Sequence, residues 1–251
     1  MSSEEADQRI AVQSCDSTDE EACLRAAASI KAKMNGVDML VYSAGISEPA
    51  RLVDLPAKTF RRVLDVNVLG ARNAIISMLP MLQASGHGCP EGARVILVGS
   101  TLSVFGLYGL AAYSASKVGL FGFAQAMHQE LLPDNIRVGV TLPADTDTPL
   151  LARENETKPQ LTKDISGAAS TQSPDEVAEG TLDGAARGQF LTTSEFTTWL
   201  MTLTAAGMGP APTLGEKIPQ VLFASIVRCV ALWFQWSWDG ILLAERQKAK
   251  A

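Results

Sequence analysis

The stretch ARVILVGS, residues 93–100, is a short apolar run that ends in a glycine and a serine. Three other runs have the same character, namely RIAVQSC at 9–15, VDMLVYSA at 37–44 and IRVGVTLP at 136–143. Strands that are buried on both faces have continuous apolar sequences of this kind, because helices cover them above and below. We therefore predict four strands of a parallel sheet.

Longer segments with helical patterning separate these strands, at about 19–34, 56–83 and 111–132. The resulting β-α-β-α-β-α-β order is typical of an α/β protein with a Rossmann-like, doubly wound parallel sheet. A chain of 251 residues fits one such domain. We place this domain at 9–210 and a separate apolar segment at 211–251.

The composition argues against several classes of function. A net charge of −6, with 47% hydrophobic and 19% charged residues, suits a globular protein and not a nucleic-acid binder, which needs clustered Lys and Arg. The four cysteines lack C-x-x-C spacing and the chain has only two histidines, so we expect no metal site, disulfide framework or Ser-His-Asp triad. The acidic start MSSEEADQ predicts neither a signal nor a transit peptide.

Residues 143–172 contain many Thr, Asp, Glu and Lys and few apolar pairs. This predicts a long surface loop, which in other proteins often serves as a functional lid. The following sequence SPDE predicts the start of a helix, with Ser173 as N-cap, Pro174 in the first turn and Glu176 completing a capping box.

The most apolar part of the chain is VLFASIVRCVALWFQWSWDGILLAERQ, residues 221–247. On a helix its polar residues form one narrow stripe, which consists of Ser225, Arg228, Gln235, Asp239 and Arg246. An arginine near the centre argues against a lone spanning helix, because it costs about 2.5–3.5 kcal/mol there. Two interpretations stay open: a helix lying in the membrane interface, with its tryptophans at headgroup level, or a helix packed in a dimer or domain interface; the tryptophans are Trp233, Trp236 and Trp238.

A possible proton-transfer pair is found in YSASK, where Tyr113 and Lys117 stand one helical turn apart. A tyrosine can pass a proton to a carbonyl oxygen, and a nearby cation favours its phenolate. Ser100 ends a predicted strand 13 residues earlier, at the sheet edge where ligands bind, and could hold the substrate oxygen. Asn67 in LDVNVLG could bind a water and extend a proton path through Lys117.

This combination resembles the short-chain dehydrogenase/reductase family, together with YSAG at 42–45. The resemblance implies a catalytic set of Asn67, Ser100, Tyr113 and Lys117, of which Tyr113 and Lys117 also contact a nicotinamide cofactor. It further implies that three residues lie beside the adenine ribose, where the family has N-N-A-G; these are Ser43, Ala44 and Gly45. Tyr42 replaces the first Asn, so its side chain has no role that the family can supply.

Two more cofactor contacts follow from the same resemblance. Asp16, after the first predicted strand, matches an acidic residue that contacts the adenine amino group, and it could equally be a turn or N-cap residue. PADTDTP at 143–149 matches a P-G-x-x-x-T loop that meets the nicotinamide amide, which implicates Pro143, Thr148 and, second, Thr146. Ala144 departs from the glycine of that pattern, and local turn chemistry is the alternative interpretation.

Four less general stretches resemble one branch of the family, the 3-ketosphinganine reductases: PADTDTP, ENETKP (154–159), GLYGLAAYSASK (106–117) and AAGMGP (205–210). This resemblance, from about residue 10 to about 245, implies NADPH-dependent reduction of a long-chain keto-sphingoid base in sphingolipid biosynthesis. It also implies a place on the cytosolic face of the endoplasmic reticulum membrane. A reductase for another carbonyl, such as a steroid, and a non-enzymatic protein are the alternatives.

In that branch a strand, a T-G-x-x-x-G-I-G loop, a helix and a second strand precede the strand predicted at 9–15, and this sequence shows none of them. The loop and the helix behind it hold the pyrophosphate. We therefore expect an N-terminally shortened reductase that binds NADPH weakly by itself. The alternative is a remnant that acts by pairing with a full-length reductase through the helices at 56–83 and 111–132, which are also the candidate surfaces for a homo-oligomer.

Overall fold

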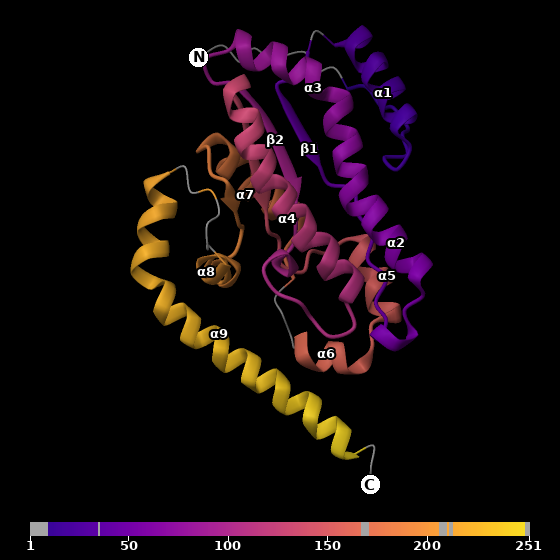
Figure 1. Cartoon of the computed structure of the whole chain (residues 1–251), viewed down its shortest axis with the longest axis vertical. Helices are drawn as coiled ribbons and strands as arrows, with labels where there is room; N and C mark the ends of the chain where they lie inside the picture. The colour runs from indigo at the N-terminus through magenta and orange to yellow at the C-terminus, as the bar shows by residue number, and fades with distance from the viewer. Residues whose placement is uncertain (1–9, 35, 167–170, 206–209, 211–212, 249–251) are drawn as a thin grey trace.

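The centre of the protein is a parallel sheet. The computed structural model describes residues 10–34, 36–166, 171–205, 210 and 213–248. Within them the strands lie side by side in the order β1 (Met39–Tyr42), β2 (Ala93–Val98), β3 (Ile136–Thr141) and β4 (Leu191–Thr192). Figure 1 shows β1 and β2 among the helices. Leu40 of β1 pairs with Val95 of β2, which pairs with Val138 of β3. The predicted fold class and the strands within 37–44, 93–100 and 136–143 are confirmed.

The strand predicted at 9–15 is wrong for residues 10–15, and Arg9 lies outside the described residues. Residues 10–15 are unpaired, and the side chains of Ile10 and Val12 are 85% and 86% exposed. A parallel strand exists only through hydrogen bonds to a neighbour. Among the described residues none pairs with this segment, so its apolar sequence alone does not make it a strand.

The helices predicted at 19–34, 56–83 and 111–132 are confirmed, with one difference. The first is α1 (Glu20–Lys33), capped by Asp19, and the third is α4 (Ala111–Leu131). The second consists of α2 (Ala57–Leu64) and α3 (Gly70–Gly88), joined by a π-helical turn over Asp65–Leu69. A π turn inserts a residue into the helical ladder and re-aims the side chains that follow.

Residues 143–172 are not the single long loop that their polar composition predicts. They contain α5 (Pro149–Thr157) and α6 (Gln160–Ser166), while 167–170 lie outside the described residues. Helix α7 (Pro174–Ala186) begins as predicted, since the Ser173 hydroxyl accepts from the Glu176 backbone N–H at 3.2 Å and the Glu176 carboxylate accepts from the Ser173 N–H at 2.7 Å. Three short 3-10 turns, Leu52–Asp54, Thr101–Ser103 and Leu132–Asp134, complete the connections before α5.

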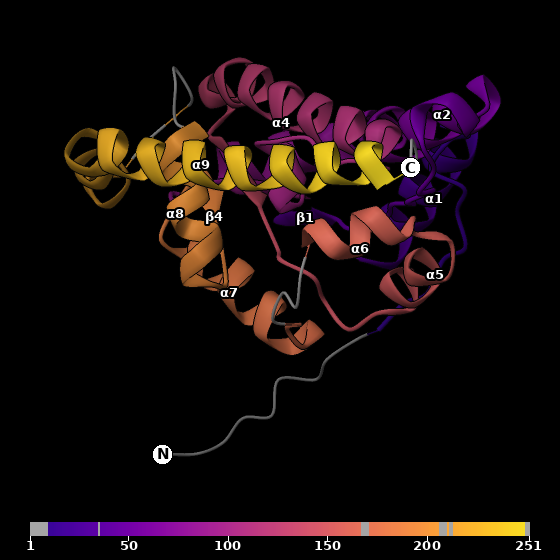
Figure 2. The ribbon, with the colours of Figure 1, turned by 90° about the horizontal axis from the view of Figure 1, so that it is seen from below.

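The predicted apolar helix is α9 (Leu214–Lys248), and it follows α8 (Phe196–Ala205). Figures 1 and 2 show α9 as a long helix that crosses one side of the molecule past α8 and α6. Its part Lys217–Ala244 is long and apolar enough to cross a membrane, by length and composition alone. Residues 206–209 of the AAGMGP stretch lie outside the described residues.

Candidate active site

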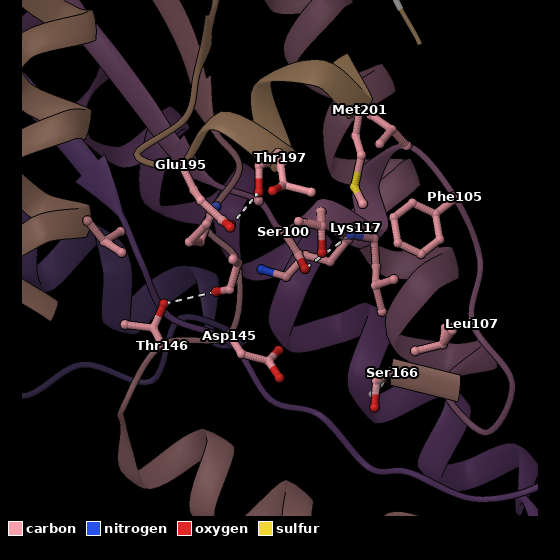
Figure 3. A pocket seen from close by; sticks show the side chains of 18 of the residues that line it. Ser100, Phe105, Leu107, Lys117, Asp145, Thr146, Ser166, Glu195, Thr197 and Met201 are labelled. Carbon is pink, nitrogen blue, oxygen red and sulfur yellow. Dashed lines mark hydrogen bonds between the residues drawn. The ribbon is translucent and has the colours of Figure 1, made fainter. Parts of the chain in front are cut away.

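A cavity of about 1560 Å³ opens at the carboxyl ends of β1, β2 and β3. Its walls are the segments after these three strands, helix α4, and residues of α5 to α9. Small-molecule sites usually measure about 300–1000 Å³, so this cavity has room for a cofactor and a large substrate together. Figure 3 shows part of the lining, with Ser100 and Lys117 near its middle.

Tyr113 and Lys117 both face this cavity from α4, as their four-residue spacing predicts. The Lys117 ammonium lies 5.5 Å from the centre of the Tyr113 ring and donates a hydrogen bond to the Val98 carbonyl oxygen at 2.8 Å. The lysine side chain is buried, and burial lowers its pKa to about 8. The carbonyl at the end of β2 therefore fixes a cation beside the tyrosine.

The pKa of the Tyr113 phenol is raised, which differs from the expectation that Lys117 favours the phenolate. Burial is the largest cause, and the Glu154 carboxylate adds to it. A hydrogen bond with the Ser100 side chain lowers the pKa, and Asp145 raises it. Tyr113 is thus held as a neutral phenol, which is the form that can donate a proton to a carbonyl oxygen.

Ser100 lies where predicted, directly after β2, and lines the cavity. The chain turns there because Ser100 caps the short Thr101–Ser103 helix: its hydroxyl oxygen accepts from the Leu102 N–H, and its own N–H donates to the Ser103 hydroxyl, both at 3.2 Å. This turn holds the Ser100 hydroxyl in hydrogen-bonding contact with Tyr113.

Asn67 is fully buried in the π-helical turn, and it joins three segments. Its amide oxygen accepts from the Ile46 N–H at 2.8 Å, and its amide nitrogen donates to the Ile46 carbonyl at 3.0 Å and to the Ser116 hydroxyl at 2.8 Å. Ser116 in turn donates to the Tyr113 carbonyl at 2.7 Å. Both amide hydrogens are therefore used in a clamp between α4 and the segment after β1.

The YSAG segment after β1 contributes Ser43 and Gly45 to the cavity lining, whereas Ala44 is not part of it. Gly45 is close to both Asn67 and Lys117, because a Cβ there would lie 3.3 Å from the Asn67 amide oxygen and 3.7 Å from the Lys117 ammonium. Tyr42 has a role that sequence reasoning missed. It is buried, and its hydroxyl donates to the Val66 carbonyl at 2.7 Å, which ties β1 to the π-helical turn.

The loop after β3 places Pro143, Thr146 and Thr148 at the cavity, together with Ala144. The two threonine hydroxyls are used locally: Thr146 donates to the Ala144 carbonyl at 3.0 Å, and Thr148 donates to the Thr146 carbonyl at 3.2 Å and caps α5. Asp16 does not line the cavity. Its carboxylate accepts from the Thr18 N–H and hydroxyl, which lowers its pKa, and Asp19 is the N-cap of α1.

A buried ion pair that sequence reasoning missed also lines the cavity. The Lys158 ammonium and the Glu154 carboxylate are 2.8 Å apart, and their side chains are only 5% and 11% exposed. The i,i+4 spacing within ENETKP is a signal that could have indicated the pair, because such residues face each other on a helix. Nothing in the sequence indicated that this ion pair is buried.

The groups at this end of the cavity fit the nicotinamide and ribose half of a dinucleotide. Ser43 and Lys117 offer hydrogen-bond donors, Gly45 leaves room beside them, and Pro143 and Ala144 bring backbone groups to the opposite wall. For the pyrophosphate, the 251 residues contain no G-x-x-x-G-x-G pattern. The fit therefore covers the reacting half of the cofactor.

Comparison with known proteins shows the family to which the chain is similar. The family model described as short chain dehydrogenase matches residues 2–159. A 3-ketodihydrosphingosine reductase of Bos taurus is 35% identical over 219 residues, which cover 87% of this chain and 64% of the relative. A 3-dehydrosphinganine reductase of Arabidopsis thaliana is 33% identical over 202 residues, 80% of this chain and 60% of the relative. The chain thus spans less than two thirds of the length of these relatives.

Two solved structures have a similar fold. A short chain dehydrogenase from Burkholderia cenocepacia in complex with NADP superposes with a TM-score of 0.64 at 21% identity, over 78% of this chain and 76% of that one. A 3-ketoacyl-(acyl-carrier-protein) reductase from Brucella melitensis complexed with NADH gives a TM-score of 0.60 at 27% identity, over 68% of each chain.

Proposed function

This chain belongs to the short chain dehydrogenase family, and on that premise we propose that it reduces the ketone of 3-ketosphinganine to the alcohol, with NADPH as hydride donor. The observation that carries the proposal is the meeting of Ser100, Tyr113 and Lys117 in one cavity whose far side is apolar. The named activities of the bovine and Arabidopsis relatives support the choice of substrate and its place in sphingolipid synthesis.

A reduced nicotinamide held beside Ser43, Gly45 and Lys117 would supply the hydride for the carbonyl carbon of the substrate. The Ser100 hydroxyl holds the carbonyl oxygen, and Tyr113, a neutral phenol in this site, donates its proton to that oxygen. As the proton leaves, negative charge develops on the phenol oxygen. The Lys117 ammonium, fixed by the Val98 carbonyl, stabilises that charge.

The test is turnover by the purified chain. The chain is tested alone and extended at its N-terminus by a strand, a T-G-x-x-x-G-I-G loop, a helix and a second strand. Each form is incubated with 3-ketosphinganine and NADPH, and sphinganine is measured by mass spectrometry. We expect the extended form to produce sphinganine and the chain alone to do so weakly, because pyrophosphate binding rests on such a loop. If neither form makes sphinganine, or if both reduce only unrelated ketones, the proposed activity is wrong.

We further propose that residues 9–210 are the reductase domain and that 211–251 attach it to the cytosolic face of the endoplasmic reticulum membrane. Helix α9 supports this, because one of its faces lines the cavity and another face is exposed. Residues spaced three or four apart face the cavity, namely Val227, Ala231, Phe234 and Trp238, and Trp238 also lies 5.6 Å from the Phe105 ring. Trp233 and Trp236 are 58% and 74% exposed instead. Of the three tryptophans predicted at headgroup level, only these two are free to meet lipid, because Trp238 packs inward.

The membrane proposal predicts that replacing both Trp233 and Trp236 by Ser weakens binding to phosphatidylcholine/phosphatidylserine vesicles by at least about tenfold, because each exposed indole would bury a large apolar area in lipid. Flotation of the vesicles measures the bound fraction. Replacement of Leu24 and Leu132, two exposed leucines on other elements, is the matched control and should leave binding unchanged. Equal loss in both variants, or no flotation of the unmodified chain, contradicts the proposal.

A homo-oligomer would use the surface between α3 and α4, within the predicted 56–83 and 111–132 segments. Leu69, Ile76 and Val118 are 45%, 42% and 47% exposed there, and a shallow groove runs beside them between Val68 and Phe123. We propose that a second copy covers this surface. Light scattering should give the mass of a dimer, and Val118→Glu should give that of a monomer; a monomeric unmodified chain refutes the proposal.

A further inference from the structure

The charged side chains that line the cavity differ in how they are neutralised. Among the described residues, Lys117 is bonded to the Val98 carbonyl, and Glu154 and Lys158 form an ion pair at 2.8 Å. Glu195 and Arg228 line the cavity on its other side, where α8 and α9 lie. Asp145 has no hydrogen bond or ion pair to its carboxylate within the described part of the chain. A carboxylate in a partly buried, largely apolar cavity is costly unless a cation or donor meets it.

The backbone of Asp145 is held firmly although it belongs to a loop. Its carbonyl accepts from the Gln172 N–H at 2.9 Å, and the Gln172 carbonyl accepts from the Asp147 N–H at 2.9 Å. This short parallel bridge fixes the loop after β3 against the start of the α7 region. Figure 3 shows the Asp145 side chain leaving this loop toward the open space beneath Ser100 and Lys117.

Asp145 and Tyr113 line the same cavity, and the Asp145 carboxylate contributes to the raised pKa of the phenol. Lys158, the cation that could neutralise Asp145, is occupied by Glu154. Because Lys158 is paired, Asp145 is a cavity carboxylate without an ion-pair partner among the described residues, and apolar side chains such as Phe105, Leu151 and Trp238 form much of the remaining wall.

The proposed substrate has the complementary chemistry. A 2-amino-3-ketone carries an ammonium on the carbon next to the carbonyl, and its alkyl chain leaves from the other side. When the carbonyl oxygen meets Ser100 and Tyr113, the ammonium has to lie near that end of the cavity. We propose that Asp145 binds the ammonium group of the substrate and so determines specificity for 2-amino ketones over uncharged ketones. This inference rests on the function proposed above.

The test measures binding and needs no cofactor. Tryptophan fluorescence of the full chain is titrated with a soluble short-chain 2-amino-1-hydroxy-3-ketone and with the same ketone lacking the amino group. We expect the amino ketone to bind about 10- to 100-fold more tightly, as a charge-assisted contact provides, and Asp145→Asn to abolish that difference. Asp147→Asn, the same change at an exposed carboxylate two residues away that does not line the cavity, should keep the difference.

Three results would overturn the inference: equal affinity of the unmodified chain for both ketones, no binding of either, or a preference that survives in Asp145→Asn. An equal loss of affinity for both ketones in Asp145→Asn would assign the residue a structural role and would also overturn it. A different result would refute the proposed function. A chain that selects the amino ketone through Asp145 but yields no alcohol with NADPH in the turnover assay refutes the reductase activity and leaves the ammonium contact standing.

Discussion

Tyr113→Phe is expected to lower the turnover of 3-ketosphinganine by about 10²- to 10⁴-fold, which is the usual contribution of a positioned proton donor. The substitution removes one hydroxyl and keeps the ring, so packing around α4 should change little. Because Tyr113 is held neutral by burial and by Glu154, the unmodified enzyme has its proton in place before the ketone binds. The phenylalanine variant has no proton to give. The measurement is the rate of sphinganine formation, made with whichever form of the chain, alone or extended, is active in the turnover assay.

Tyr108→Phe is the matched control for this experiment. Tyr108 stands shortly before α4 and does not line the cavity, so the loss of its hydroxyl should leave turnover within about twofold, as for a surface change. Turnover by Tyr113→Phe within about tenfold of the unmodified enzyme would refute the role of proton donor. Unchanged thermal unfolding of both variants shows that a loss of turnover is chemical.

Lys158→Met is expected to lower the free energy of unfolding by about 3–5 kcal/mol, because it leaves the Glu154 carboxylate buried without its partner. The Asp145 carboxylate adds like-charge repulsion, because burial and the Glu154 carboxylate both raise the pKa of Asp145 and Lys158 opposes that effect. Urea unfolding measures the change. The double variant with Glu154→Gln and Lys158→Met should recover most of the loss, because it removes the unpaired charge together with its partner.

The control for the ion pair is Arg187→Met. Arg187 and Asp183 have the same i,i+4 spacing on α7, but their side chains are 61% and 73% exposed and their charged atoms are 3.6 Å apart. Exposed pairs of this type contribute about 0.3–0.5 kcal/mol. If Lys158→Met costs no more than Arg187→Met, the buried pair does not stabilise the fold as proposed.

Most of the fold could be predicted from the sequence, and the exceptions have specific causes. The apolar runs that became β1, β2 and β3 are surrounded by helices, so their pattern and their environment agree. Residues 10–15 have a similar pattern but no neighbouring strand among the described residues, and strand formation depends on that neighbour. Residues 143–172 were predicted as a surface loop because charged residues are usually solvated. In the structure Glu154 lies in α5 and Lys158 directly after it, and the two neutralise each other and are buried.

The candidate site also has a part that the sequence predicted and a part that depends on tertiary contacts. The spacing of Ser100, Tyr113 and Lys117 identified side chains that the structure brings to one cavity. For Asn67 the position was predicted correctly near the site, whereas its clamp to Ile46 and Ser116 depends on how the π-helical turn packs on α4. The role of Tyr42 likewise depends on a contact with a segment 24 residues away.

By itself, the sequence determined the parallel sheet, the helix that carries Tyr113 and Lys117, and an apolar C-terminal helix, because each of these follows from local periodicity and spacing. Only the tertiary structure decided the charges around the phenol, since they come from helices and loops far apart in the chain. Burial raises the pKa of Tyr113 and lowers that of Lys117. Lys158 is paired with Glu154, and Asp145 faces the cavity without an ion-pair partner among the described residues. Burial and charge pairing depend on which segments meet, and that is a property of the folded chain.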